Sequence, residues 1–284
     1  MKPAPFAFAR PSTLEEALEA LAGEPGAKVL AGGQSLVPLL SMRLAAPSML
    51  VDINALPDLG HVTVTSEGDA PGVRIGALAR HADVLASPAA ASSQPLLAMA
   101  LSHVAHPTIR NRGTTVGSLV HADAAAEMPM VLRLLEGSVD VASVRGRRTI
   151  PASELFAGPL ESTLAHDEIA VEAFFPALPP GGGVAFQEIA RRHGDYALVG
   201  VAAYVECTAD EVTAARVGYV SVSDVPVVVD VIDALDDPEG AALAQLDPAE
   251  DIHASADYRA HLVRVLTPRV LADAITHSLE RAKK

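Results

Sequence analysis

The first residues that could do chemistry are two adjacent glycines, Gly32 and Gly33, which follow a short apolar run at residues 28–31. Glycine has no side chain, so a ligand can approach the backbone, and successive N–H groups can form a nest for an anion such as a pyrophosphate. Ser35 adds a hydroxyl donor. The pattern is neither the dinucleotide-binding G-x-G-x-x-G nor a P-loop. Taken alone, such a pair is more typical of a tight turn without a ligand.

A second polar segment, RNRGTTVGSL at residues 110–119, lies between two apolar regions. Its arginine, asparagine, threonine and serine residues place many hydrogen-bond donors in a short stretch, which suits a phosphate or a ribityl chain. A solvated loop explains the same composition equally well.

Two further groups of residues have side chains that could form a site. Four residues with metal-binding side chains are near one another in the sequence: His103, His106, His121 and Asp123. Zinc sites usually show tighter ligand pairs, so we expect no metal. Residues 191–196, RRHGDY, form a charged turn that is either an ordinary hairpin tip or a place where Tyr196 covers an aromatic ligand.

The elements that must position these segments follow from turn residues and hydrophobic periodicity. Ser12-Thr13-Leu14-Glu15 predicts a capping box with Ser12 as the N-cap residue of a first helix. Strands are expected on both sides of the glycine pair, whereas residues 108–120 show no regular period. A Pro/Gly-rich linker at residues 179–183 precedes three expected strands and a helix-rich end. The three strands are expected at residues 184–189, 197–205 and 212–222.

Composition excludes several classes of function. The 284 residues carry a formal net charge of −14, which disfavours nucleic acid and anionic membranes as partners. The single cysteine, Cys207, can form neither an intrachain disulfide nor an iron–sulfur cluster, which usually takes four thiolates. We also expect no signal peptide and no transmembrane segment, and therefore a cytoplasmic protein.

Taken in order, these segments resemble the FAD-binding medium subunits of molybdenum hydroxylases, the carbon monoxide dehydrogenase and xanthine dehydrogenase type. AGGQSLVPLLSMRLAAPSMLVDIN, at residues 31–54, is similar to the N-terminal FAD signature of that family. The remaining segments of the pattern are RIGALAR, HPTIRNRGT, GSLVHADAAAEMP, RRTIPASELF, DEIAVEAFFP, ARRHGDYALVGVA and SADYRAHLVRVL. Their order and spacing extend the resemblance over nearly the whole chain.

The resemblance implies an α+β chain with the two-subdomain FAD-binding fold of the vanillyl-alcohol oxidase (PCMH) type. A C-terminal subdomain with a three-stranded sheet and a helical bundle would follow. The expected subdomains are residues 1–55, 56–177 and 178–284.

The resemblance also implies the residues that bind FAD. The pyrophosphate cradle would be Ala31, Gly32, Gly33, Gln34, Ser35 and Leu36. The second FAD loop would be Gly113, Thr114, Thr115, Gly117 and Ser118. Five further residues would lie near the cofactor: Asp123, Glu127, Ile169, Gln187 and Tyr196. No catalytic residue is expected, because the flavin itself carries the redox chemistry.

The function implied by the resemblance is electron transfer within a complex. A large subunit with a molybdenum cofactor would oxidise the substrate, and a small subunit with 2Fe–2S clusters would pass the electrons to FAD. The acceptor would be NAD or a quinone. Two alternatives stay open, namely a structural subunit without FAD and a free-standing flavin oxidase.

One residue departs from the family pattern. Val116 stands where the second loop usually has the first glycine of a Gly-Gly pair. A β-branched residue resists a positive φ, so Val116 predicts either a rearranged loop or weakened FAD binding.

Overall fold

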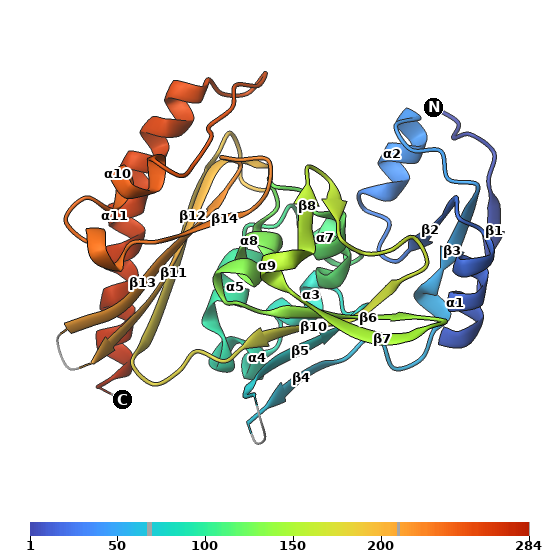
Figure 1. Cartoon of the computed structure of the whole chain (residues 1–284), viewed down its shortest axis with the longest axis horizontal. Coiled ribbons are helices and arrows are strands. Elements are labelled where there is room, and N and C mark those ends of the chain that lie inside the picture. The colour runs from blue at the N-terminus through green and yellow to red at the C-terminus, as the bar shows by residue number, and fades with distance from the viewer. Residues whose placement is uncertain (67–69, 209–210, 284) are drawn as a thin grey trace.

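The described residues form one two-stranded sheet and three larger β-sheets, which follow one another along the chain and lie side by side along the long axis of the molecule (Figure 1). The computed structural model describes residues 1–66, 70–208 and 211–283. The strands of the three sheets fall within residues 7–52, 62–176 and 182–230. The division into three subdomains, with boundaries between these sheets, stays a proposal.

The first sheet is parallel and has the order β1-β3-β2. Its elements are β1 (Ala7–Ala9), α1 (Leu14–Gly23), β2 (Ala27–Leu30), α2 (Leu36–Met42), β3 (Met49–Asp52) and η1 (Ile53–Ala55). The expected capping box is displaced by one residue. Thr13 is the N-cap residue of α1, and its hydroxyl accepts from Glu16 N at 3.2 Å, whereas Ser12 donates to the Glu16 carboxylate. Either Ser12 or Thr13 fits the N-cap position of the motif, and burial of Ala17, Leu18 and Leu21 selects Thr13.

The middle sheet is antiparallel with the order β4-β5-β10-β6-β7. Its strands are β4 (Val62–Thr65), β5 (Gly72–Gly76), β6 (Ser138–Ser143), β7 (Gly146–Pro151) and β10 (Ile169–Pro176). One face packs against short helices, so Ile75, Val139 and Phe175 are buried. The other face carries Arg74 and Glu172, which form an ion pair at 2.6 Å.

Short helices connect the strands of this sheet. They are α3 (His81–Leu85), α4 (Pro88–Ser93), α5 (Pro95–Leu101), α6 (Pro107–Arg110), α7 (Thr115–His121), α8 (Glu127–Leu134) and α9 (Ala152–Leu155). A small hairpin follows, with β8 (Phe156–Gly158) and β9 (Glu161–Ser162). The expectation of an irregular segment at residues 108–120 is therefore wrong, because α6 and α7 occupy most of it.

The C-terminal sheet has four strands instead of the expected three. They are β11 (Gly182–Ala190), β12 (Ala197–Thr208), β13 (Glu211–Val220) and β14 (Val227–Asp230). The short run of valines in β14 pairs antiparallel with β13. The helical end is not a bundle, because one long helix, α11 (Ala256–Arg281), carries the apolar stripe. The remaining elements there are η2 (Ile232–Ala234) and α10 (Pro238–Leu243).

Two hydrophobic cores hold the chain together. The larger one is shared by the first and middle sheets and reaches the C-terminal sheet at Val184 and Tyr204. The second lies between the C-terminal sheet and α11. Both faces of the C-terminal sheet are therefore covered. Helix α11 covers one face, and helices that connect the strands of the middle sheet cover the other, where Met130 of α8 packs against Gly218.

In the described part of the chain, no helix has the length and apolar character needed to cross a bilayer. Nor do the described residues bring three or more histidine, cysteine, aspartate or glutamate side chains together in a way that could hold a metal ion.

Candidate functional site

The glycine pair forms the turn between β2 and α2. Gly33 has φ +71°, a conformation that favours glycine. Within the described ranges, the N–H groups of Gly32, Gly33, Gln34 and Ser35 donate to no protein acceptor. The turn is held from its carbonyl side instead, because Gln34 Nε2 donates to Gly32 O at 2.9 Å. A row of amides without a protein acceptor can bind an anion.

The second segment begins a helix. Thr114 is the N-cap residue of α7, and its Oγ1 accepts from Gly117 N at 3.1 Å. The amides of Gly113, Thr115 and Ser118 donate to Ile109 O, Ala79 O and Thr114 O. Few main-chain amides of residues 113–118 are therefore free for a ligand, because the capped helix uses most of these donors itself. The Ser118 side chain is partly exposed and makes no hydrogen bond within the described residues.

The two segments touch each other. A Cβ atom added to Gly32 would collide with the carbonyl oxygen of Arg112 and would lie 2.8 Å from Cα of Gly113. Only glycine at position 32 allows this approach of backbone to backbone. The free amides of the first turn and the start of α7 thus belong to one site.

Two side chains that the sequence motifs left without a role connect these segments. Asn54 Nδ2 donates to Ala31 O at 2.8 Å. Arg80 Nη2 donates to Asn54 Oδ1 and Arg80 Nη1 donates to Arg112 O, each at 2.7 Å. Both residues lie within the quoted segments VDIN and RIGALAR, but their partners are distant in sequence. No local pattern could have identified them.

His81 contacts the second segment through its main chain and its side chain. Its main-chain N–H donates to Gly113 O at 2.9 Å, and its ring Nδ1 lies 3.2 Å from Thr115 Oγ1. Burial and the nearby positive charge of Arg110 lower its pKa to about 4. The ring is therefore neutral at pH 7 and serves as a hydrogen-bonding support, not as a charge.

A group of titratable residues lies beyond the C-terminal end of α7. Glu127, the first residue of α8, is 6% exposed. Its pKa is raised to about 8, first by burial and then by the charges of Glu188 and Asp123. The Glu127 carboxyl group is therefore mostly protonated at pH 7. It can donate a hydrogen bond, which an ionised carboxylate cannot do.

His103 and Glu188 belong to the same group. His103 Nδ1 lies 3.2 Å from Glu188 Oε1, and this hydrogen bond is the main cause of the raised pKa of His103. The second oxygen of Glu188 is buried and has no partner among the described residues. The pair joins the end of α5 to β11, and so links the middle and C-terminal sheets.

Of the three other expected residues, Tyr196 belongs to the group of Asp123 and Glu127, whereas Ile169 and Gln187 do not. Most of the Tyr196 ring is exposed, while desolvation at its hydroxyl and the charges of Asp123 and Glu127 raise its pKa. Ile169 is 1% exposed in the core at the start of β10. Gln187 points away, because its amide donates to Asp273 of α11 at 2.6 Å. Side chains alternate along β11, so Phe186 and Glu188 face His103 instead.

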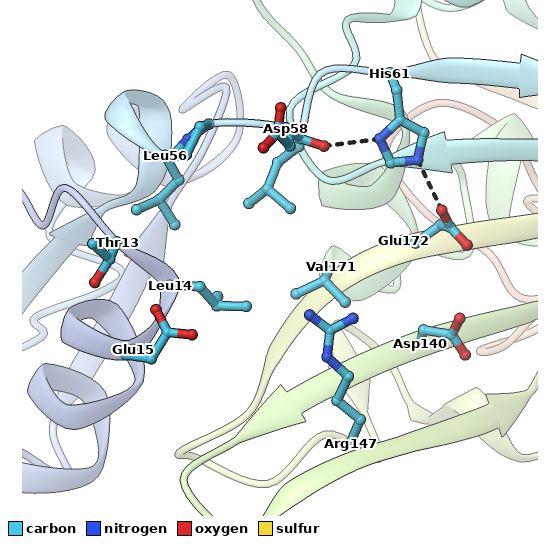
Figure 2. Close-up of a pocket in the computed structure, with 12 residues that line it drawn as sticks. Thr13, Leu14, Glu15, Leu56, Asp58, His61, Asp140, Arg147, Val171 and Glu172 are labelled. Atoms are coloured by element: carbon cyan, nitrogen blue, oxygen red, sulfur yellow. Dashed lines mark hydrogen bonds and ion pairs between the residues drawn. The ribbon is translucent and has the colours of Figure 1, made fainter.

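A cleft of about 480 Å³ lies elsewhere, between α1 and the outer face of the middle sheet (Figure 2). His61 lies at one edge of it, with Nδ1 2.9 Å from Asp58 O and Nε2 2.8 Å from Glu172 Oε2. Glu15 and Arg147 also line it. None of the residues expected to bind the cofactor lines this cleft.

The position of Val116 explains how the chain accepts a valine where the family pattern has a glycine. It lies in the first turn of α7, is 2% exposed, and does not have a positive φ. A glycine is therefore not required at this position, since the chain adopts a conformation that any residue accepts. The side chain fills the core and not the space beside the free amides.

This placement predicts the effect of Val116→Gly. The variant loses a buried side chain and gains a flexible residue in a helix, so its free energy of unfolding should fall by about 2–3 kcal/mol. FAD binding should not tighten. Urea denaturation against Val144→Gly, at a side chain that is exposed, provides the measurement and control. A Val116→Gly protein as stable as the parent would contradict this placement.

Known proteins match the chain over nearly all of its length. Residues 4–178 match the family described as the FAD binding domain in molybdopterin dehydrogenase. The alpha subunit of the 6-hydroxypseudooxynicotine dehydrogenase complex of Paenarthrobacter nicotinovorans is 41% identical, over 97% of this chain and 96% of that protein. The nicotine 6-hydroxylase medium subunit of the same organism is 42% identical, over 96% and 99%.

A solved structure agrees with these sequence matches. Carbon monoxide dehydrogenase from Hydrogenophaga pseudoflava, in a form that lacks the Mo-pyranopterin moiety, superposes with a TM-score of 0.91 at 31% identity. The match covers 98% of this chain and 99% of that one.

Proposed function

We propose that this protein transfers electrons. The premise is that the chain belongs to the family of FAD-binding domains in molybdopterin dehydrogenases. It is an FAD-binding medium subunit of the molybdenum hydroxylase type, and its relatives are oxidoreductase subunits. In our proposal it receives electrons from iron–sulfur clusters of a small partner subunit. It passes them through FAD to NAD or a quinone.

The observation that supports this proposal is the row of free amides from Gly32 to Ser35. A diphosphate has several oxygens that accept hydrogen bonds, and fixed amides bind it without needing to reorganise. We assign the diphosphate of FAD to this turn, together with Ala31 and Leu36. The partly exposed side chain of Ser118 completes the site, since the amides of its segment are largely used within the protein and the buried hydroxyl of Thr114 caps α7.

The flavin ring is assigned to the region of Asp123, Glu127 and Tyr196. Residues 115–121 of α7 span about 10 Å, at 1.5 Å per residue, between the diphosphate site and this group. When bound, FAD supplies the redox chemistry, because a flavin accepts single electrons and releases a pair. The protein's part is to hold the ring, with the protonated Glu127 offering a hydrogen bond and Tyr196 offering an aromatic surface.

The partners in this proposal follow from what the chain lacks. A single thiol, Cys207, cannot hold a 2Fe–2S cluster, so such clusters must belong to another subunit. A large subunit with the molybdenum cofactor would oxidise the substrate. Location in the cytoplasm stays a prediction.

Purification from the native source tests the proposal in two measurements. We expect a flavin absorption spectrum, with FAD released on denaturation in a one-to-one ratio to the chain. We also expect molybdenum and iron to co-purify in separate chains. A colourless protein that still assembles with its partners would favour the structural subunit without FAD. A flavin-containing monomer that oxidises a substrate unaided would favour the free-standing oxidase.

A further inference from the structure

A continuous chain of hydrogen bonds joins the two segments of the cofactor site. It runs from Ala31 O to Asn54 Nδ2 at 2.8 Å, from Asn54 Oδ1 to Arg80 Nη2 at 2.7 Å, and from Arg80 Nη1 to Arg112 O at 2.7 Å. Both ends of this chain are main-chain carbonyls, one in each segment. Its length therefore sets the separation of the two backbones.

Each member of this chain is held in place by further contacts. The Asp52 carboxylate accepts from Asn54 N at 3.0 Å and from Asn54 Nδ2 at 2.6 Å, which fixes the orientation of the amide. Arg80 N donates to Asp83 Oδ2 at 2.9 Å, and Arg80 pairs with Thr114 in an isolated β-bridge. Arg80 thus contacts the second segment through both its backbone and its side chain.

The positive charge of Arg80 is compensated at longer range, by the carboxylates of Asp83 and Asp52. Among the described residues, no carboxylate oxygen lies within 4.0 Å of its guanidinium group. Burial and the positive charge of Arg112 lower the pKa of Arg80 more than the charges of Asp83 and Asp52 raise it, although the group stays charged at any ordinary pH. An anion bound at the adjacent free amides would relieve this excess of positive charge.

We propose that Arg80 and Asn54 are positioning residues that hold the Gly32 turn and the start of α7 at the separation which a diphosphate requires. The inference rests on the proposed function, because the diphosphate is that of FAD. The guanidinium group suits this role because its planar fork reaches two acceptors at once, whereas the ammonium group of a lysine is a single point.

The experiment compares FAD affinity in four variants of the full-length subunit, freed of FAD and titrated by flavin fluorescence. Arg80→Met and Asn54→Leu remove the bridge, and Arg80→Lys keeps the charge but loses the fork. We expect FAD affinity to fall by roughly ten- to hundredfold for Arg80→Met and about tenfold for the other two. The matched control, Arg74→Met, changes an arginine on the outer face of the middle sheet and should bind FAD normally.

A second readout separates positioning from general stability. In the variants without FAD, hydrogen exchange should speed up at the hydrogen-bonded amides of the two segments, namely Val37, which donates to Gly33 O, and Arg112, Gly113, Thr115 and Gly117, while the thermal midpoint stays close to that of the parent. The double variant Arg80→Met/Asn54→Leu should be no weaker in FAD binding than the worse single variant, because the bridge is broken only once. Additive losses, or wild-type affinity in Arg80→Lys and Asn54→Leu, would overturn the inference.

Failure of the proposed function would look different. In that case the parent protein would not take up FAD at all. The hydrogen-exchange comparison needs no ligand, so unchanged exchange in the two segments would still refute the bridge itself.

Discussion

Gly32→Ala should abolish FAD retention by a subunit that otherwise folds. The added methyl group would meet the carbonyl oxygen of Arg112 and Cα of Gly113, both backbone atoms. Backbone cannot swing aside as the end of a long side chain can, so the first turn and the start of α7 must separate. The cost of such overpacking is typically 1–3 kcal/mol. Because the whole site depends on this contact, we expect the dissociation constant for FAD to rise by roughly a hundredfold or more.

The matched control is Gly60→Ala. A Cβ atom at that position would meet nothing within 4 Å, and Gly60 does not have a positive φ. Both proteins should show the same circular dichroism spectrum, and only Gly32→Ala should lose the flavin absorption after gel filtration. Full FAD occupancy in Gly32→Ala would mean that the diphosphate does not bind at this contact.

Glu127→Gln should make the protein more stable in alkali. In the folded chain the pKa of Glu127 is raised from an ordinary 4.5 to about 8, first by burial. Between pH 4.5 and pH 8, the chain therefore takes up a proton at Glu127 when it folds. The stability contributed by this proton is fully present below pH 4.5 and is lost as pH rises through 8. At about 1.4 kcal/mol per pKa unit, the loss amounts to a few kcal/mol by pH 9.

Glutamine keeps the size of the side chain and cannot ionise, so this loss should disappear. Urea denaturation at pH 5, 7 and 9 should show a higher free energy of unfolding for Glu127→Gln than for the parent at pH 9, and a small difference at pH 5. His103, whose pKa is also raised, contributes a loss of the same sign in both proteins, because its hydrogen bond with Glu188, the main cause, is kept and only the smaller contribution of Glu127 is removed. Glu136→Gln, at a carboxylate whose side chain is 73% exposed, is the control. Parallel pH profiles for Glu127→Gln and the parent would refute a buried, protonated carboxyl group.

Local signals predicted those parts of the site that depend on neighbouring residues. The glycine turn follows directly from an apolar strand and two residues without side chains, and the structure has it between β2 and α2. The start of α7 was missed, although Thr114 is a good N-cap residue, because the glycines around it favoured a loop. The capping hydrogen bond from Gly117 N outweighs that preference.

A single sequence does not determine which side chains of β11 lie on which face of the sheet, that is, the phase of this strand. The resemblance placed Gln187 near the cofactor, but strand alternation puts Gln187 toward α11 and Glu188 toward His103. A shift of one residue exchanges the two faces of a strand, and both faces of this sheet are covered by apolar elements. Hydrophobicity along β11 therefore contains no signal that distinguishes the two phases.

From the sequence by itself came the family, the cofactor and the turn that offers free amides, because each depends on residue types and spacings within short segments. Tertiary structure alone decided that Gly32 rests against Gly113, that Asn54 and Arg80 bridge the two segments, and that Glu127 is buried beside other acids. The physical reason is that hydrogen-bond partners and desolvation are set by residues far apart along the chain, which meet only when the sheets pack together.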